Sequence, residues 1–225
     1  MMKYLHIFFY ICWCILMIFG LLFTINIVSY ITSQPPTWPN RTQGILTSIG
    51  NLYLPAFGMY LHFLSGFFLM IFSNFQLLPI FEYKYYRLLH KVFGTINVFF
   101  CLTLSLGGLT FISSNGTSGG LNMSLAFSCY GVLLLIMSIV TYVYIRYRNK
   151  QKHIEWAIRL YALIMSSLFY RILYLIAFVC GYRISSAQDF KRPLDMCFDW
   201  MFFIMPLCLA ELIVQYNRRY RAVLN

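Results

Sequence analysis

The sequence predicts an all-α, polytopic membrane protein with about six transmembrane helices. Hydrophobic residues make up 60% of the 225-residue chain and charged residues only 10%, whereas a soluble domain carries about 25% charged residues. Mean hydropathy is +0.71, which agrees with this class. The same composition excludes a disordered chain, because low hydrophobicity is what prevents a chain from collapsing. The net charge of +11 does not indicate a nucleic-acid-binding protein, because there is no soluble domain on which a basic patch could form.

Six apolar segments are long enough to cross a bilayer. In lipid every backbone N–H and C=O must bond within its own segment, so a span is a helix of about 20 mostly apolar residues or part of a closed barrel. Barrel strands alternate polar and apolar residues, and these segments do not. The predicted helices are residues 7–32, 53–80, 91–112, 122–146, 154–181 and 197–216. The first is longer than the apolar core of a signal peptide, so we expect it to be retained.

Four of these helices carry a stripe of small and polar residues at helical spacing. In a bilayer such residues are tolerated where helices face one another or a cavity. The stripes comprise His62, Ser65, Gly66, Leu69, Ser73 and Gln76; His90, Gly94, Asn97, Cys101, Ser105 and Gly108; Ser124, Ser128, Gly131, Ser138 and Tyr142; and His153, Ala157, Leu160, Ile164, Ser167 and Arg171. We therefore predict that the second to fifth helices form a four-helix core with these stripes inward. For the small residues, close packing alone is a sufficient explanation.

The basic residues gather at one face of the predicted bundle. This face holds 12 of the 17 Lys and Arg residues, namely Lys3, Lys84, Arg87, Lys91, Arg146, Arg148, Lys150, Lys152, Arg159, Arg218, Arg219 and Arg221. The positive-inside rule then places both termini in the cytoplasm. The glycosylation sequons at Asn40, Asn115 and Asn122 all lie on the predicted outer side, in agreement.

The chain divides into three predicted regions. These are 1–52, a first helix and a Pro-containing outer loop; 53–182, the four-helix core; and 183–225, an outer loop, a sixth helix and a basic cytoplasmic tail. Cys180 and Cys197 bracket the second outer loop and could pair in an oxidising compartment. Two free, packed thiols are the alternative that we favour.

Ionisable residues within the spans are candidates for function, because each is costly at bilayer depth unless it has a partner or a purpose. His62 and Arg171 lie in the middle of their spans and could share one depth. They could form a polar site open to the outer side, which binds an anionic group or relays a proton. The alternative is a pair of Arg171 with Asp199 or Asp195 that locks the fifth and sixth helices together. The polar membrane residues singled out on this basis are Arg171, Asp199, Gln76, Asn97 and Glu211.

His90 and His153 are candidate ligands of haem or another metal at the cytoplasmic end. Haem b in a helical bundle needs two imidazoles at one depth on facing helices, with small and aromatic residues around the ring. Arg87 or Arg159 could hold the haem propionates, and Gly94 would give the ring room. Both histidines also lie at the first turn of their helices, where a hydrated helix end or a lipid headgroup contact is the alternative.

An ordered set of motifs resembles a family of multi-pass membrane proteins known as domain-of-unknown-function family 2306. The motifs are His62-x3-Gly66, Phe75-Gln76, Arg87-x2-His90-x3-Gly94, Gly107-Gly108, Gly119-Gly120 and His153-x2-Trp156-Ala-Ile-Arg159-Leu-Tyr161-Ala162-Leu163 with Arg171. The resemblance covers residues 60–182 and implies a membrane-embedded core of about four helices, but no activity. The placing of His62, His90 and His153 is also similar to that in small membrane b-type cytochromes, an analogy of architecture only.

Two classes of function stay open, and with them whether the protein is an enzyme. The first is a redox-type protein that binds haem, another metal or quinone through His62, His90 and His153. The second is a non-enzymatic membrane protein, either a carrier of protons or small solutes or a scaffold for a membrane complex. No hydrolase motif or phosphate-binding loop is present. We expect a multi-pass integral protein of a plasma or inner membrane, in contact with lipid and with possible membrane-complex partners, but not with nucleic acid.

The charge distribution predicts the side of the membrane on which the C-terminus lies. A tag attached after Asn225 should react with an impermeant reagent only when the cytoplasmic side is opened, because the basic residues near it resist translocation. Labelling of this tag in intact cells would show that the C-terminus lies outside and that the predicted orientation is wrong.

Overall fold

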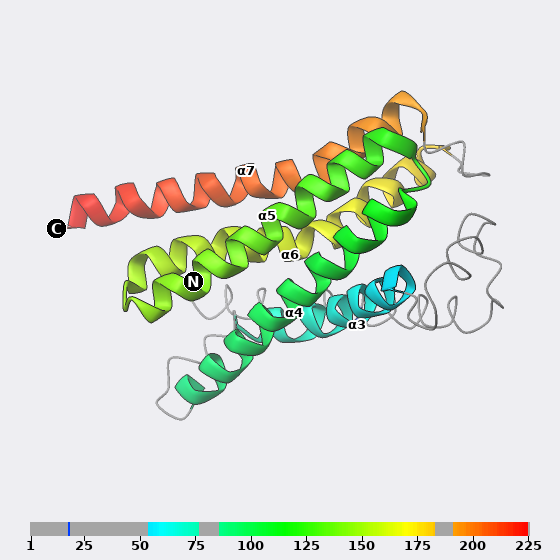
Figure 1. The fold of residues 1–225 in the computed structure, drawn as a ribbon. Coiled ribbons are helices and arrows are strands. Elements are labelled where there is room, and N and C mark those ends of the chain that lie inside the picture. Colours follow the sequence, from blue (N-terminus) through cyan, green and yellow to red (C-terminus); the bar gives the residue numbers. More distant parts are fainter. Residues whose placement is uncertain (1–17, 19–53, 77–85, 183–190, 225) are drawn as a thin grey trace.

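Five long α-helices make up the part of the chain that this computed structural model describes, which is Ile18 and residues 54–76, 86–182 and 191–224. The helices are α3 (Leu54–Phe75), α4 (Tyr86–Asn115), α5 (Gly120–Arg146), α6 (Lys150–Val179) and α7 (Pro193–Leu224), as drawn in Figure 1. These ranges contain no strand, and each of the five helices is long and apolar enough to cross a membrane. The predicted all-helical, multi-pass class is therefore confirmed. The predicted span 7–32 lies outside the described residues, apart from Ile18.

Helices α4 and α7 are longer than the predicted spans 91–112 and 197–216. An apolar stretch marks only the part of a helix inside lipid, whereas backbone hydrogen bonding continues through polar residues at the interface. The start of α6 is fixed by its cap, since the Asn149 side chain accepts a hydrogen bond from the Lys152 backbone N–H at 3.1 Å.

Helices α3 to α6 form a ring of four. Each packs against the next in the chain, and α6 also contacts α3, so α4 and α6 occupy diagonally opposite corners. Helix α7 packs outside the ring against α6 and α5. It still adds Phe202 and Phe203 to the main hydrophobic cluster, which also contains Leu69, Cys101, Leu104, Ala126, Tyr130, Leu134, Leu160, Leu163 and Ile164. The helix expected outside the four-helix core thus supplies two of the core's aromatic side chains.

The basic residues of the described helices collect at one end of the bundle. The start of α4, the α5–α6 turn and the end of α7 point the same way in Figure 1. They carry Arg87, Lys91, Arg146, Arg148, Lys150, Lys152, Arg218 and Arg219. We call this the basic end and the other the opposite end.

The closest helix crossing joins α3 to α4 at two glycines. A methyl group on Gly107 would overlap the carbonyl oxygen of Gly58 and come within 3.2 Å of the His62 backbone nitrogen. Backbone atoms cannot move aside as a flexible side chain can, so this crossing requires glycine. Its effect is to bring His62 directly against α4.

Gly107→Ala should therefore destabilise the α3–α4 pair by about 1–3 kcal/mol, the usual cost of overpacking. Gly66→Ala is the matched control, because a methyl group there meets only Leu104 Cδ1, at an ordinary 3.5 Å. Unfolding of the purified protein in detergent measures both. Equal stability of the two variants would show that the glycine crossing is not tight.

Candidate functional site

His90 and His153 lie near the starts of α4 and α6, both at the basic end. They are close enough for their charges to interact. His153 Nδ1 is 3.0 Å from the Thr141 carbonyl oxygen. A carbonyl only accepts hydrogen bonds, so Nδ1 carries the hydrogen and the lone pair of Nε2 is left for another partner. The structure thus places the two predicted site histidines at the same end of the ring, on diagonally opposite helices.

Gln76 and Gly94 lie beside His90. A methyl group on Gly94 would have Gln76 Oε1, at 3.8 Å, as its nearest neighbour. Gly94 follows His90 by one helical turn, so it leaves room on the face of α4 that carries the imidazole. Asn97 follows one turn further and is 6% exposed. The α4 side of the interior at this end is therefore polar.

A hydrogen bond joins α3 to α6 at the basic end. The Tyr161 hydroxyl donates to Asn74 Oδ1 at 2.7 Å, and Asn74 is fully buried. Sequence reasoning assigned no role to either residue. Tyr161 counts as an aromatic residue in a hydropathy pattern, so only its place in the motif with His153 drew attention to it.

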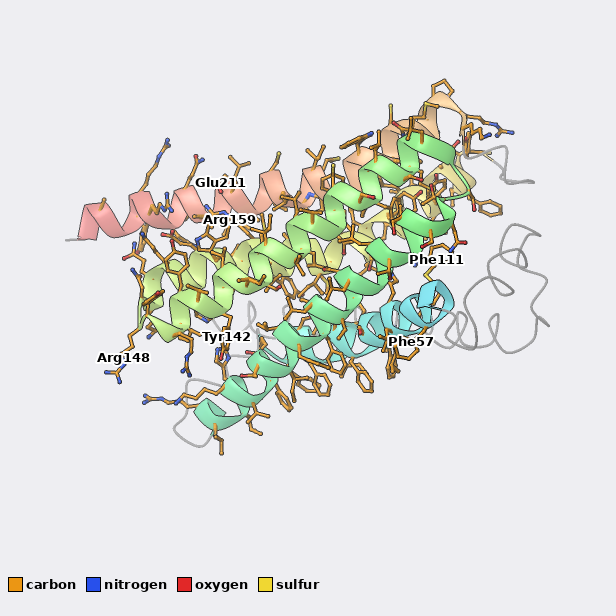
Figure 2. All side chains as sticks on the ribbon, viewed as in Figure 1. Phe57, Phe111, Tyr142, Arg148, Arg159 and Glu211 are labelled. Carbon is orange, nitrogen blue, oxygen red and sulfur yellow. The ribbon has the colours of Figure 1, made fainter. Side chains whose placement is uncertain are left out.

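Two ion pairs join α6 to α7 near the basic end. Arg159 donates to Glu211 Oε2 from Nε at 2.8 Å and from Nη2 at 2.6 Å. Figure 2 labels both residues, which lie next to each other on α6 and α7. Arg218 donates to both oxygens of Glu155, at 2.9 and 2.5 Å. Arg159 also lies over the Trp156 ring, 5.1 Å from its centroid. Arg159, predicted as a propionate ligand, is thus held by α7 instead.

Glu155 is the residue that the sequence reasoning missed at this end. It is only 6% exposed, and its carboxylate depends on Arg218. Its spacing from Arg159, four residues along one helix face, is the signal that could have drawn attention to it.

At mid-depth His62 is attached to α4. Its Nδ1 lies 2.8 Å from the Leu104 carbonyl oxygen, and its ring lies against Gly108. One turn further along α3, the Ser65 and Thr103 hydroxyls are 2.6 Å apart. The contacts of His62 therefore serve α3–α4 packing.

Arg171 reaches the same level from α6. It donates from Nη1 to the Ser167 carbonyl at 2.5 Å and lies within electrostatic range of His62 and Tyr130. His62 and Arg171, predicted to share a depth, are thus brought near each other.

Asp199 belongs to a separate network at the opposite end. It accepts from the Tyr170 hydroxyl and from Asn122 Nδ2, both at 3.1 Å. The Trp200 indole N–H donates to Asn122 Oδ1 at 3.1 Å, so the side chain of this sequon residue is held between helices.

Asp195, one turn before Asp199, is equally buried. It accepts from the Tyr174 hydroxyl at 2.7 Å and from Tyr182. Burial and the bond to Asp195 raise the pKa of Tyr182, which lies in the connection after α6. Repeats at i and i+4, Tyr170 with Tyr174 and Asp195 with Asp199, are the signal that sequence reasoning overlooked. Cys180 and Cys197, at the same end, are free thiols.

Comparison with known proteins supports the family resemblance. The profile of a family described as "Predicted membrane protein (DUF2306)" matches residues 59–214, which is more than half of the chain. No curated protein and no solved structure matches the chain.

The α6–α7 ion pairs give a stability prediction. Arg218→Ala should lower the stability of the protein, because it removes the arginine that donates to both oxygens of the buried Glu155 carboxylate. Arg219→Ala, at the exposed neighbouring position, should change stability by less than about 0.5 kcal/mol. The double variant Glu155→Leu with Arg218→Leu should recover much of the stability that Arg218→Ala loses, because it leaves no unpaired charge. Unfolding in detergent measures all three, and an equal effect of the two alanine variants would contradict the role of the pair.

Proposed function

Since the chain belongs to the DUF2306 family of membrane proteins, whose description states no activity, we propose a function from the site itself: a redox-type membrane protein that binds haem b at the basic end. His90 and His153 are the residues that would hold its iron. The observation that carries the proposal is that these two imidazoles come from diagonally opposite helices, at the same end of the ring, and lie within electrostatic range. Another metal, or a quinone at the same histidines, would be an alternative outcome of the test below.

The number of ligands favours haem over a bare metal ion. A metal ion held by side chains alone generally has three or more protein ligands. Among the described residues, no group of three or more His, Cys, Asp or Glu side chains is placed to hold one. The porphyrin itself supplies four nitrogens to its iron, so two histidines are enough.

The surroundings of the histidines fit this group. The Nδ1–H of His153 is directed to the Thr141 carbonyl, which fixes the ring and leaves Nε2 as the ligand atom, as is usual for ligating histidines. Gly94, one turn from His90, carries no side chain, and Gln76 Oε1 would be the nearest atom to a methyl group there, at 3.8 Å. A bound haem would supply one-electron transfer, and the chain's own residues would set its orientation and its access to water.

The propionates are assigned to Arg87. Arg159 is engaged by Glu211 and Trp156, so using it would break an ion pair between α6 and α7. Arg87 is exposed and precedes His90 by three residues, which puts both on one face of α4. His62 is not a proposed ligand, because it lies at mid-depth with Nδ1 bonded to Leu104 and its ring against Gly108.

The test is a visible absorption spectrum of the protein expressed with haem supply. We expect a Soret band that is lost in both His90→Ala and His153→Ala, because each removes one axial ligand. His62→Ala is the control and should keep the band. Elemental analysis for bound metal and extraction of bound quinone accompany the spectrum. The proposal fails if the wild type has no Soret band, or if the band survives both substitutions.

A further inference from the structure

The interior face of α4 continues as a polar row beyond the proposed haem site. Asn97, Cys101 and Ser105 follow one another at four-residue spacing, so their side chains share one face of the helix. Their exposed fractions are 6%, 0% and 1%. All three lie in a helix that is long and apolar enough to cross a membrane, and the rest of the protein buries them.

Two atoms of this row have no hydrogen-bond partner within the part of the chain that the structure describes. They are Asn97 Oδ1 and Ser105 Oγ. Three other buried serines in the described helices donate to a carbonyl of the preceding turn, namely Ser73 to Leu69, Ser138 to Leu135 and Ser166 to Ala162. Ser105 departs from this pattern although it lies in the same kind of helix.

Such atoms require a partner that the described residues do not supply. Buried polar atoms in native proteins are nearly always satisfied, and an internal water molecule is the usual partner when no protein group is near. The requirement is strongest inside a bilayer, where no alternative partner exists. A site for water must offer several polar groups, and here the Asn97 amide, the Ser105 hydroxyl and the Cys101 thiol line one face.

We propose that Asn97 and Ser105 bind a cluster of ordered water molecules inside the four-helix ring. The cluster runs along α4 from the level of Asn97 to that of Ser105, next to the Leu104 carbonyl that holds His62. Gln76 Nε2, also buried and without a partner in the described residues, extends the polar row toward the basic end. This inference rests on the α4 side chains and stands whether or not haem binds.

Such a cluster would give His62 a hydrogen-bonded connection toward the basic end. Arg171 lies within electrostatic range of His62, and a fixed positive charge repels protons and other cations. The connection therefore runs from the basic end to His62 at mid-depth and does not continue past Arg171. Its chemical role is the exchange of protons between His62 and the basic end.

Cys101 is a native reporter for this water, because it lies between the two proposed partners. X-ray radiolysis of the whole protein in detergent produces hydroxyl radicals from bound water, and these oxidise the side chains next to it. We expect rapid oxidation of Cys101 despite its 0% exposure. Phe202 is 1% exposed and packs against other aromatic rings, so it should be protected from oxidation. Each rate is divided by that of the free amino acid, so that intrinsic reactivity cancels.

Variants assign the water to its partners. Asn97→Leu with Ser105→Ala should lose most of the Cys101 oxidation, and Ser105→Ala alone should lose part of it with little change in volume. Ser138→Ala is the matched control, because its hydroxyl is bonded within its own helix, and it should leave the rate unchanged. Circular dichroism checks that each variant is helical. The proposal is overturned if Cys101 is as protected as Phe202 in the wild type, or if the Ser105→Ala rate equals that of Ser138→Ala.

Discussion

The constraint on which the structure depends is that polar groups inside a bilayer must find partners within the protein. Backbone groups meet it by forming helices, and side chains meet it by turning toward a neighbouring helix. The hydrogen bonds from His62 to Leu104, from Tyr161 to Asn74 and from Tyr170 to Asp199 each cross between two helices. Polar contacts, rather than burial of apolar surface, thus specify which helices are neighbours, because lipid is as apolar as the core.

The fold was largely predictable from the sequence because the same constraint shapes hydropathy. Apolar stretches located the five described helices. The small and polar stripes located the inner faces only in part, since Tyr142 of the stripe predicted on α5 is 40% exposed. Helix ends were less predictable, since α4 and α7 continue through polar interface residues that hydropathy counts against a span. The contribution of α7 to the core also could not be read from the sequence, because periodicity identifies an inner face but not the helix that it meets.

The candidate site was predicted in part. Helical spacing was enough to bring His90 and His153 to one end and His62 near Arg171. It could not assign partners to charges, so the pairing of Arg159 with Glu211 was not predicted and Glu155 was overlooked. The tyrosines around Asp195 and Asp199 were overlooked for another reason. A pattern search counts tyrosine as aromatic and apolar, whereas inside a bilayer its hydroxyl is a polar group.

The two ion pairs between α6 and α7 also determine how α7 can lie along its neighbour. On α6 the acid, Glu155, precedes the base, Arg159, and on α7 the acid Glu211 precedes the base Arg218. Because the helices run in opposite directions, each acid faces a base only when α7 is at one height. Sliding α7 by a turn would separate both pairs and take Arg218 away from the buried Glu155 carboxylate, which is destabilising because breaking a pair leaves a buried charge less well compensated. The membrane-spanning helix that follows the four-helix ring therefore has a single permitted vertical position, fixed by charge order rather than by the shape of its apolar surface.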